Sequence, residues 1–269
     1  KENKHWMSTE NRMLAVNSGT SGELAKDVFF AYRGYRMNYY AVTAMLARVY
    51  CWAGEYGNAY KEAKEVVDAT YSTGSTSTAS CFNFSNSLTT NRKDYNSIIM
   101  TFFKSTCYED YLPYMTKGND VVLVVNTTNL FGDEAGADDR NLDLFGDWDG
   151  GDIKYSFKYD IKEGTSGTDM IPAIRLSEMY YIMGEYFAYK DEFSKAGEML
   201  DKVRYARGIS TTNLASSIGS LEVFHTHLIK EMRREFVGEG QMFFQYKRLD
   251  QKPKDNVVFV FDKPNNEDI

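Results

Sequence analysis

Residues 39–67 read YYAVTAMLARVYCWAGEYGNAYKEAKEVV and carry the clearest structural signal in the chain. Apolar residues recur every three or four positions in the first half, as they do on one face of an α-helix: Tyr39, Val42, Met45, Leu46, Val49 and Tyr50. Gly54 marks the end of that helix, because glycine readily adopts the left-handed conformation of a C-terminal cap. The same spacing resumes from Tyr56 to Val67, so the stretch predicts a helical hairpin over about residues 35–70.

A second hairpin is predicted over residues 172–208. Its apolar faces are Ile174, Leu176, Met179, Tyr180, Ile182, Met183 and Phe187, then Phe193, Ala196, Met199, Leu200 and Val203. The two hairpins align without gaps at an offset of 137, which places Ala47 on Gly184, Tyr56 on Phe193 and Ala59 on Ala196. A small residue at a helix crossing and an aromatic at the turn are typical of a tetratricopeptide-type (TPR) repeat. A chance match of two amphipathic hairpins is the alternative, since a solenoid normally needs three or more repeats.

The rest of the chain is less regular. Residues 72–170 form a loop-rich excursion in which 98–100 and 121–125 fit either short strands or buried turns. Residues 133–152 carry eight carboxylates against one arginine, Arg140, and are expected to be solvated and flexible. A last helix is predicted over 221–249, with Leu228, Met232, Phe236, Phe243 and Tyr246 on its apolar side. We therefore predict a single all-α domain over 1–269, with TPR-like hairpins as scaffold, irregular loops and at most short β-strands.

The composition argues against several classes of partner and site, but it does not identify a function. The 269 residues suffice for one large domain, and a net charge of −7 argues against a nucleic-acid partner, which would favour a basic surface. Cys51, Cys81 and Cys107 are too few and too widely spaced for a disulfide framework or a zinc site. No apolar run approaches the ~20 residues that cross a bilayer. The chain opens on Lys-Glu-Asn-Lys, without an initiating Met or a secretion signal, so we expect a processed protein or a fragment.

Several polar clusters were weighed as catalytic or metal sites. Glu231, Glu235 and Glu239 lie one helical turn apart, and a glycosidase using Glu235 and Glu239 is the last of our alternatives. Ion pairing with Arg175, Arg233 and Arg234 is the expected role, because buried carboxylates are usually paired.

Metal binding is not expected either. His225 and His227 point to different sides of a helix, which disfavours a site with Glu222 and Glu231. Calcium binding by Asp138, Asp139, Asp147, Asp149 or Asp152 was weighed against a solvated loop, which we favour because no EF-hand spacing is present. We predict no cofactor.

The motifs together resemble the SusD/RagB family in order and spacing. Residues 39–50 are similar to its A-x-x-A-x-L-A-R-V-Y helix, 54–59 to its G-D/E-Y-x-x-A turn, and 174–180 to its R-L-A-E-x-Y segment. The most specific piece, EMRREFVGEG at 231–240, resembles E-R-R-R-E-F-x-x-E-G and runs into FFQYKR at 243–248. Met242, Gln245 and Asp262 depart from the family pattern. The resemblance covers about residues 35–70 and 139–267.

Membership would imply a non-enzymatic nutrient receptor on the outer face of a Gram-negative outer membrane, held there by an N-terminal lipid anchor that lies outside this chain. It would bind an oligosaccharide, or in some members a peptide, and deliver it to a SusC-like TonB-dependent transporter. Typical members are longer at the N-terminus, so this chain resembles the C-terminal portion or a short member. A TPR-type adaptor that binds a peptide or protein is the main alternative.

A glycan site needs exposed aromatic rings, which stack on the apolar face of a pyranose, and polar groups for its hydroxyls. The predicted ligand-binding residues are loop aromatics with nearby polar side chains: Tyr108, Tyr111, Tyr114, Trp148, Tyr155, Asn129, Asp147 and Asp149. Tyr39, Tyr50 and Trp52, on the first helix, are expected in the core.

Overall fold

The computed structural model describes residues 7, 8, 12, 32–73, 75–116, 119, 122–147, 150–160 and 169–249, and the backbone of 260–262. Its helices are α2 (Tyr39–Trp52), α3 (Tyr56–Val67), α4 (Cys107–Met115), α5 (Thr127–Phe131), α6 (Asp139–Leu144), α7 (Leu176–Ala188), α8 (Phe193–Ala206), α9 (Leu221–Glu235) and α10 (Met242–Arg248). Its strands are β1 (Thr70–Ser72), β2 (Thr78–Ser80), β3 (Ile98–Phe103), β4 (Val122–Asn126), β5 (Phe145–Asp147), β6 (Ile153–Ser156), β7 (Met170–Arg175) and β8 (Val260–Asp262). The predicted helical fold with short strands is confirmed.

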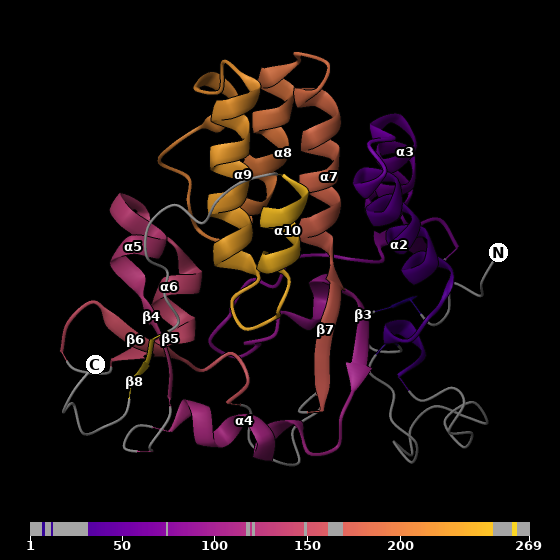
Figure 1. Cartoon of the computed structure of the whole chain (residues 1–269). Helices are drawn as coiled ribbons and strands as arrows, with labels where there is room; N and C mark the ends of the chain where they lie inside the picture. The colour runs from indigo at the N-terminus through magenta and orange to yellow at the C-terminus, as the bar shows by residue number, and fades with distance from the viewer. Residues whose placement is uncertain are drawn as a thin grey trace, which may run out of the picture.

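The two predicted hairpins lie side by side, although about a hundred residues separate them in sequence. Helix α3 packs on α7 as well as on α2, and α8 packs on α7 and α9, so the helices form one continuous row (Figure 1). The chain leaves this row after α3 and returns through β7, which pairs antiparallel with β3 and leads directly into α7. Ile174, predicted on the first helix of the second hairpin, lies in β7 instead.

The repeat at offset 137 is visible in the backbone of the two turns. Gly54 and Asp191 occupy equivalent positions with φ of 76° and 58°. The next residues, Glu55 and Glu192, have φ/ψ of −85°/59° and −87°/57°. The amide of Glu55 donates to the Tyr50 carbonyl and that of Glu192 to the Phe187 carbonyl, both at 2.9 Å. The agreement makes a chance match untenable, and the hairpins are copies of one structural unit.

Helix α2 buries a different face from the one predicted. Its small residues Ala41, Ala44 and Ala47 lie in the core, while Val42, Leu46 and Val49 are exposed. Small side chains let α3 and α7 approach the α2 backbone closely, and contact at short range outweighs the larger apolar area of the opposite face. The prediction was therefore right about the helix and wrong about Val42, Leu46 and Val49, whereas Met45 and Tyr50 of the predicted face are partly buried and pack against the core. The prediction that Tyr39 and Trp52 lie in the core was also wrong, since both side chains are exposed.

A mixed region lies beside and below the helical row, and Figure 1 shows it with α5 and α6 above the strands. Strands β5, β6, β4 and β8 form an antiparallel sheet in that order, and α4 packs against β4. The segments 98–100 and 121–125, predicted as strands or buried turns, are strands over 98–103 and 122–126.

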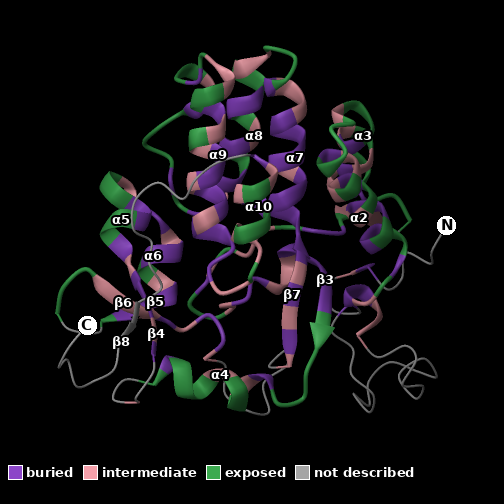
Figure 2. Ribbon diagram, in the orientation of Figure 1, coloured by how far each residue is buried: buried purple, intermediate pink, exposed green. Residues whose placement is uncertain are grey.

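Two further sequence predictions are corrected. The acidic stretch 133–152 is not simply a solvated excursion, because it contains α6 and β5, and Asp138 and Arg140 are buried. The helix predicted over 221–249 is two helices, α9 and α10, separated at Gly238 and Gly240, whose positive φ of 74° and 70° cannot continue an α-helix. Phe243 is consequently exposed and does not lie in the core. Figure 2 shows exposed residues on α10.

Candidate functional site

The recognisable block at 231–240 builds a buried ionic network. Arg140 of α6 donates to Asp138 at 2.7 Å, to Glu231 at 2.9 Å and to Glu235 at 3.2 Å. Arg207, which follows α8, donates to the other Glu235 oxygen at 2.5 Å. The network joins α6, α8 and α9, and removal of any partner would leave an uncompensated buried charge. Ion pairing was the predicted role of these glutamates.

Glu239 belongs to a second buried group. Its carboxylate pairs with Arg175 at 2.6 Å and with Lys158 at 2.5 Å. Burial lowers the pKa of Lys158 to about 8, although Glu239 opposes that shift. Of the expected arginine partners, Arg175 pairs with Glu239 and Arg234 with Glu231, whereas Arg140 and Arg207 were not foreseen. Asp139-Arg140 and residues 196–208 resemble family segments, but that resemblance does not say which glutamates these arginines meet, because they come from elements distant from α9.

The electrostatics of Glu235 follow from its two arginines. Burial by itself raises the pKa of this carboxyl, but Arg207 and Arg140 outweigh the burial and the net pKa lies well below its ordinary value. Such a carboxylate holds its charge firmly and is poorly suited to donate a proton as a general acid. This geometry gives the glycosidase alternative no support at Glu235.

The residues weighed and disfavoured as metal ligands have other surroundings where the structure describes them. No group of three His, Cys, Asp or Glu side chains is placed there to hold a metal ion. Asp138, one of the weighed calcium ligands, is fully buried and held by Arg140. Burial lowers the pKa of His225 and His227, and the His225 ring lies against Tyr189 and Phe224.

The predicted tyrosines lie in the region below the helical row. Tyr108, Tyr111 and Tyr114 are on α4, where Tyr114 is exposed and Tyr111 stacks on Tyr159 with ring centroids 4.3 Å apart. Tyr155 is on β6, and its ring covers the backbone of its strand partner Gly146, where an added Cβ would lie 2.7 Å from the ring. Tyr111 and Tyr155 thus have packing roles, and Tyr114 has a ring free for a ligand.

The predicted polar groups are more scattered. Asp147 is exposed at the end of β5 and accepts a hydrogen bond from the Gly150 amide at 2.9 Å. Asn129 is exposed on α5. Trp148 and Asp149 lie outside the described residues. The structure therefore places some of the predicted residues in one region of the molecule without showing a single assembled site.

A groove of about 310 Å³ provides an aromatic surface that the sequence did not reveal. Three exposed rings line it: Trp52 at the end of α2, Phe102 on β3 and Phe244 on α10. Its polar lining includes Arg48, Glu239, Gln241 and Gln245. Ile171, also in the lining, packs against the same buried cluster as Tyr111, so the groove borders the α4 region.

The groove is held open by fixed polar contacts at its floor. Arg48 donates to both carboxylate oxygens of Glu178, at 2.6 and 2.5 Å, and to the Ala173 carbonyl at 2.8 Å. Arg248 pairs with Glu185 at 2.6 Å and so fixes α10 against α7. Gly238 and Gly240 are the sequence signal that could have revealed the groove, because they separate α9 from the helix that carries Phe244.

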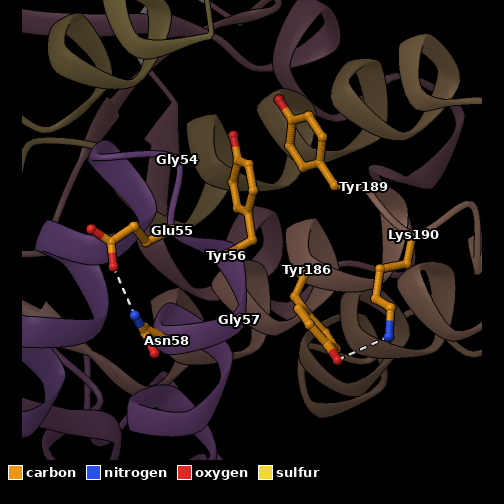
Figure 3. A pocket seen from close by; sticks show the side chains of 8 residues that line it. All are labelled: Gly54, Glu55, Tyr56, Gly57, Asn58, Tyr186, Tyr189 and Lys190. Carbon is orange, nitrogen blue, oxygen red and sulfur yellow. Dashed lines mark hydrogen bonds between the residues drawn. The ribbon is translucent and has the colours of Figure 1, made fainter.

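A second hollow, of about 480 Å³, lies where the two hairpin turns meet (Figure 3). Tyr56 stacks on Tyr189 with ring centroids 4.0 Å apart, and Tyr186 stacks on Tyr60 at 4.3 Å. Lys190 donates to the Tyr186 hydroxyl at 3.2 Å. These rings cover one another's faces, whereas Trp52, Phe102 and Phe244 in the groove are 43%, 60% and 53% exposed. The groove is therefore the better candidate for stacking on a sugar.

Comparison with known proteins settles the family. The SusD family model matches residues 31–263, which is most of the sequence. The chain belongs to the SusD family. No curated protein matches it.

Solved structures share the fold. A SusD superfamily protein from Bacteroides thetaiotaomicron VPI-5482 is 24% identical, with a TM-score of 0.59 over 82% of this chain and 52% of its own. A SusD-like carbohydrate binding protein from Bacteroides vulgatus ATCC 8482 is 18% identical, with a TM-score of 0.57 over 90% and 49% of the two chains. A laminarin binding SusD-like protein is 16% identical, with a TM-score of 0.56 over 81% and 56%. The chain spans about half the length of these relatives.

Proposed function

We propose that this protein binds an oligosaccharide or polysaccharide nutrient at the cell surface and delivers it to a SusC-like TonB-dependent transporter, without breaking a bond. Membership of the SusD family, from the match over residues 31–263, is the observation that carries the proposal. Two of the similar solved structures are described as binding carbohydrate or laminarin. Placement at the outer membrane through a lipid anchor outside residues 1–269 is part of the same proposal.

The groove offers a physical means of recognising a glycan. Trp52, Phe102 and Phe244 expose flat apolar rings that fit the CH face of a pyranose, and Gln241 stands among them to meet a hydroxyl. The tyrosines of α4, Tyr155, Trp148, Asn129, Asp147 and Asp149 form our proposed second contact surface. Stacking on fixed rings needs no charge on the ligand and suits a neutral sugar.

No helix in the described part of the chain is long and apolar enough to cross a membrane.

Binding of soluble glycans by calorimetry tests the function. We expect the purified protein to bind at least one member of a panel that includes laminarin. We expect Trp52→Ala and Phe244→Ala each to weaken binding by about fivefold or more, since loss of one stacking ring costs about 1 kcal/mol or more. Leu142→Ala is the control, because Leu142 is an exposed apolar residue of α6 that does not line the groove.

The variants also separate the two contact surfaces. Loss of binding in Trp148→Ala with full binding in Trp52→Ala would place the glycan on the second surface and overturn the groove as the site. An absence of binding to every glycan, with binding to peptides, would favour the adaptor alternative. The tyrosine-lined hollow between the hairpin turns is the feature that supports a peptide ligand (Figure 3).

A further inference from the structure

A small cavity lies within the buried ionic network, and basic side chains dominate its lining. Seven of the lining residues are basic, whereas two are acidic, Asp94 and Glu235. Six of the seven basic residues are buried, among them Arg140, Arg175 and Arg207. Charges act on one another more strongly in such a buried place than in water, so the surplus of cations favours a negative occupant.

The carboxylates that pair with several of these cations lie outside the lining of the cavity. Glu239 pairs with both Arg175 and Lys158, at 2.6 and 2.5 Å. Glu231 pairs with Arg234 at 2.9 Å. Neither glutamate lines the cavity, although the three cations do. The cations are therefore paired on one side and still surround the cavity on the other.

One of these cations has an unused hydrogen-bond donor. Arg207 donates to Glu235 through Nε at 3.1 Å and through Nη2 at 2.5 Å, and Nη2 also lies 2.7 Å from Asp94. Its Nη1 is buried and meets no hydrogen-bond acceptor among the described residues. The Phe84 ring, 4.9 Å from the guanidinium carbon, covers a face of the group. A buried charged donor of this kind requires a bound water or ion as its acceptor.

We propose that the cavity binds one chloride ion, which accepts a hydrogen bond from Nη1 of Arg207 and is attracted by the charges of Arg175 and Lys158. The space open to the centre of a water-sized sphere is about 10 Å³, which suits one water or one monatomic ion and excludes sulfate, phosphate or a sugar. Hydrogen bonds between a charged donor and a charged acceptor are stronger than those to a neutral acceptor, which favours the anion over a water.

The ion would fasten the excursion 72–170 to the helical row. Lys158 follows β6, Arg175 ends β7 and Arg207 follows α8, so the three cations come from separate parts of the chain. The cavity and the aromatic groove have no lining residue in common. We therefore expect chloride to stabilise the fold without competing with a glycan, and the proposal does not depend on the ligand of the groove.

Thermal unfolding in sodium chloride and in sodium methanesulfonate at equal concentration tests the proposal, because methanesulfonate has the same charge and is too large for the cavity. We expect a Tm about 2 °C or more higher in chloride, since a ligand that binds only the folded state raises Tm. Arg207→Lys removes Nη1 but keeps the charge, and Leu88→Phe fills the cavity from its apolar lining. Both variants should lose the difference. Arg248→Lys, which alters the ion pair with Glu185 away from the cavity, should keep it.

A crystal grown in sodium bromide gives a readout that does not need a variant to fold. We expect an anomalous bromide peak within hydrogen-bond distance of Nη1 of Arg207. A water there without an anomalous signal would overturn the proposal, and so would equal Tm values of the unmodified protein in the two salts. A chloride effect of the same size in all three variants would also overturn it, because it would assign the effect to the protein surface.

Discussion

The hairpins α2–α3 and α7–α8 are copies of one unit, yet the protein uses them differently. Their turns agree to within a few degrees at Glu55 and Glu192, and both cross at a buried alanine, Ala59 or Ala196. The α7–α8 hairpin is enclosed by α3 on one side and α9 on the other, whereas α2 leaves one apolar face open. A shared backbone therefore does not imply a shared environment.

The copies also differ in how they are anchored. Arg204 of α8 is buried and pairs with Glu134 at 2.5 Å and with Asp201 at 3.3 Å. The equivalent position of α3 is Val67, an apolar residue at the edge of the first core cluster. The ionic network thus ties the second helix of one copy to the excursion 72–170, whereas at this position the second helix of the other copy is held by apolar packing. Because the two hairpins share a turn and differ in the residues around it, the same structural unit can occupy both the centre and the edge of one row of helices.

The largest expected difference between the copies is in core energetics. Met179→Ala should lower the free energy of unfolding by about 2–5 kcal/mol, because it leaves a cavity under α3. Val42→Ala, at the equivalent position of α2, should change it by less than about 0.5 kcal/mol in a chain of residues 1–269, because Val42 is exposed there. Urea unfolding monitored by circular dichroism measures both. Similar losses at the two positions would contradict the contrast between covered and open faces.

The ion pairs that Glu134 forms with α8 and α9 should make the free energy of unfolding depend on pH in the acid range. Burial raises the pKa of Glu134, but Arg234, Arg204 and Lys230 outweigh it and hold the pKa at about 2, against an ordinary 4.5. A carboxyl with a lowered folded pKa stabilises the fold above its unfolded pKa, and that stability is lost as the pH falls from about 4.5 toward 2.

The expected size of this effect is about 1 kcal/mol after solvent screening. Urea unfolding at pH 6 and pH 3 should show a smaller difference between the two pH values for Glu134→Gln than for the unmodified protein. Glu198→Gln, on the exposed side of α8, should leave the difference unchanged. If Glu134→Gln and the unmodified protein lose the same unfolding free energy between pH 6 and pH 3, the ion pairs of Glu134 do not anchor α8.

The smallest expected effect lies in the turns, where the copies are most alike. Asp191 holds a left-handed φ of 58° where Gly54 has 76°. Asp191→Gly should raise the free energy of unfolding by about 0.5–1 kcal/mol, because glycine adopts this conformation without strain. Gly54→Asp should lower it by a similar amount, since an added Cβ meets nothing within 4 Å and only backbone strain is left. Thermal unfolding of the two variants measures both, and changes of the same sign would show that the turns are not equivalent.

Sequence periodicity found the helices more reliably than their buried sides. The apolar spacing in α2 fitted two faces, and the larger side chains of Val42, Leu46 and Val49 suggested the wrong one. Burial was decided by how closely α3 and α7 approach, which depends on small residues such as Ala44 and on neighbours distant in sequence. Single-chain periodicity also missed the break between α9 and α10, although Gly238 and Gly240 marked it.

The candidate site was harder to predict than the fold. Trp52, Phe102 and Phe244 come from three distant elements; Trp52 was expected in the core, and no role was predicted for Phe102 or Phe244. Their exposure follows from the packing of β7 and α10 beside α2, which no local pattern encodes. The predicted tyrosines of α4 were correctly placed outside the helical core, but only Tyr114 was found exposed while Tyr111 is stacked on Tyr159.

The sequence by itself determined the two helical hairpins, the repeat at offset 137 and the family, because these rest on local spacing and on motifs read in order along the chain. Only the tertiary structure decided that the two hairpins lie side by side, which arginines meet Glu235, and which aromatic rings line the groove. Those outcomes depend on contacts between residues that are about a hundred positions or more apart in sequence. The physical reason is that burial and ion pairing are properties of the assembled neighbours and not of a segment alone.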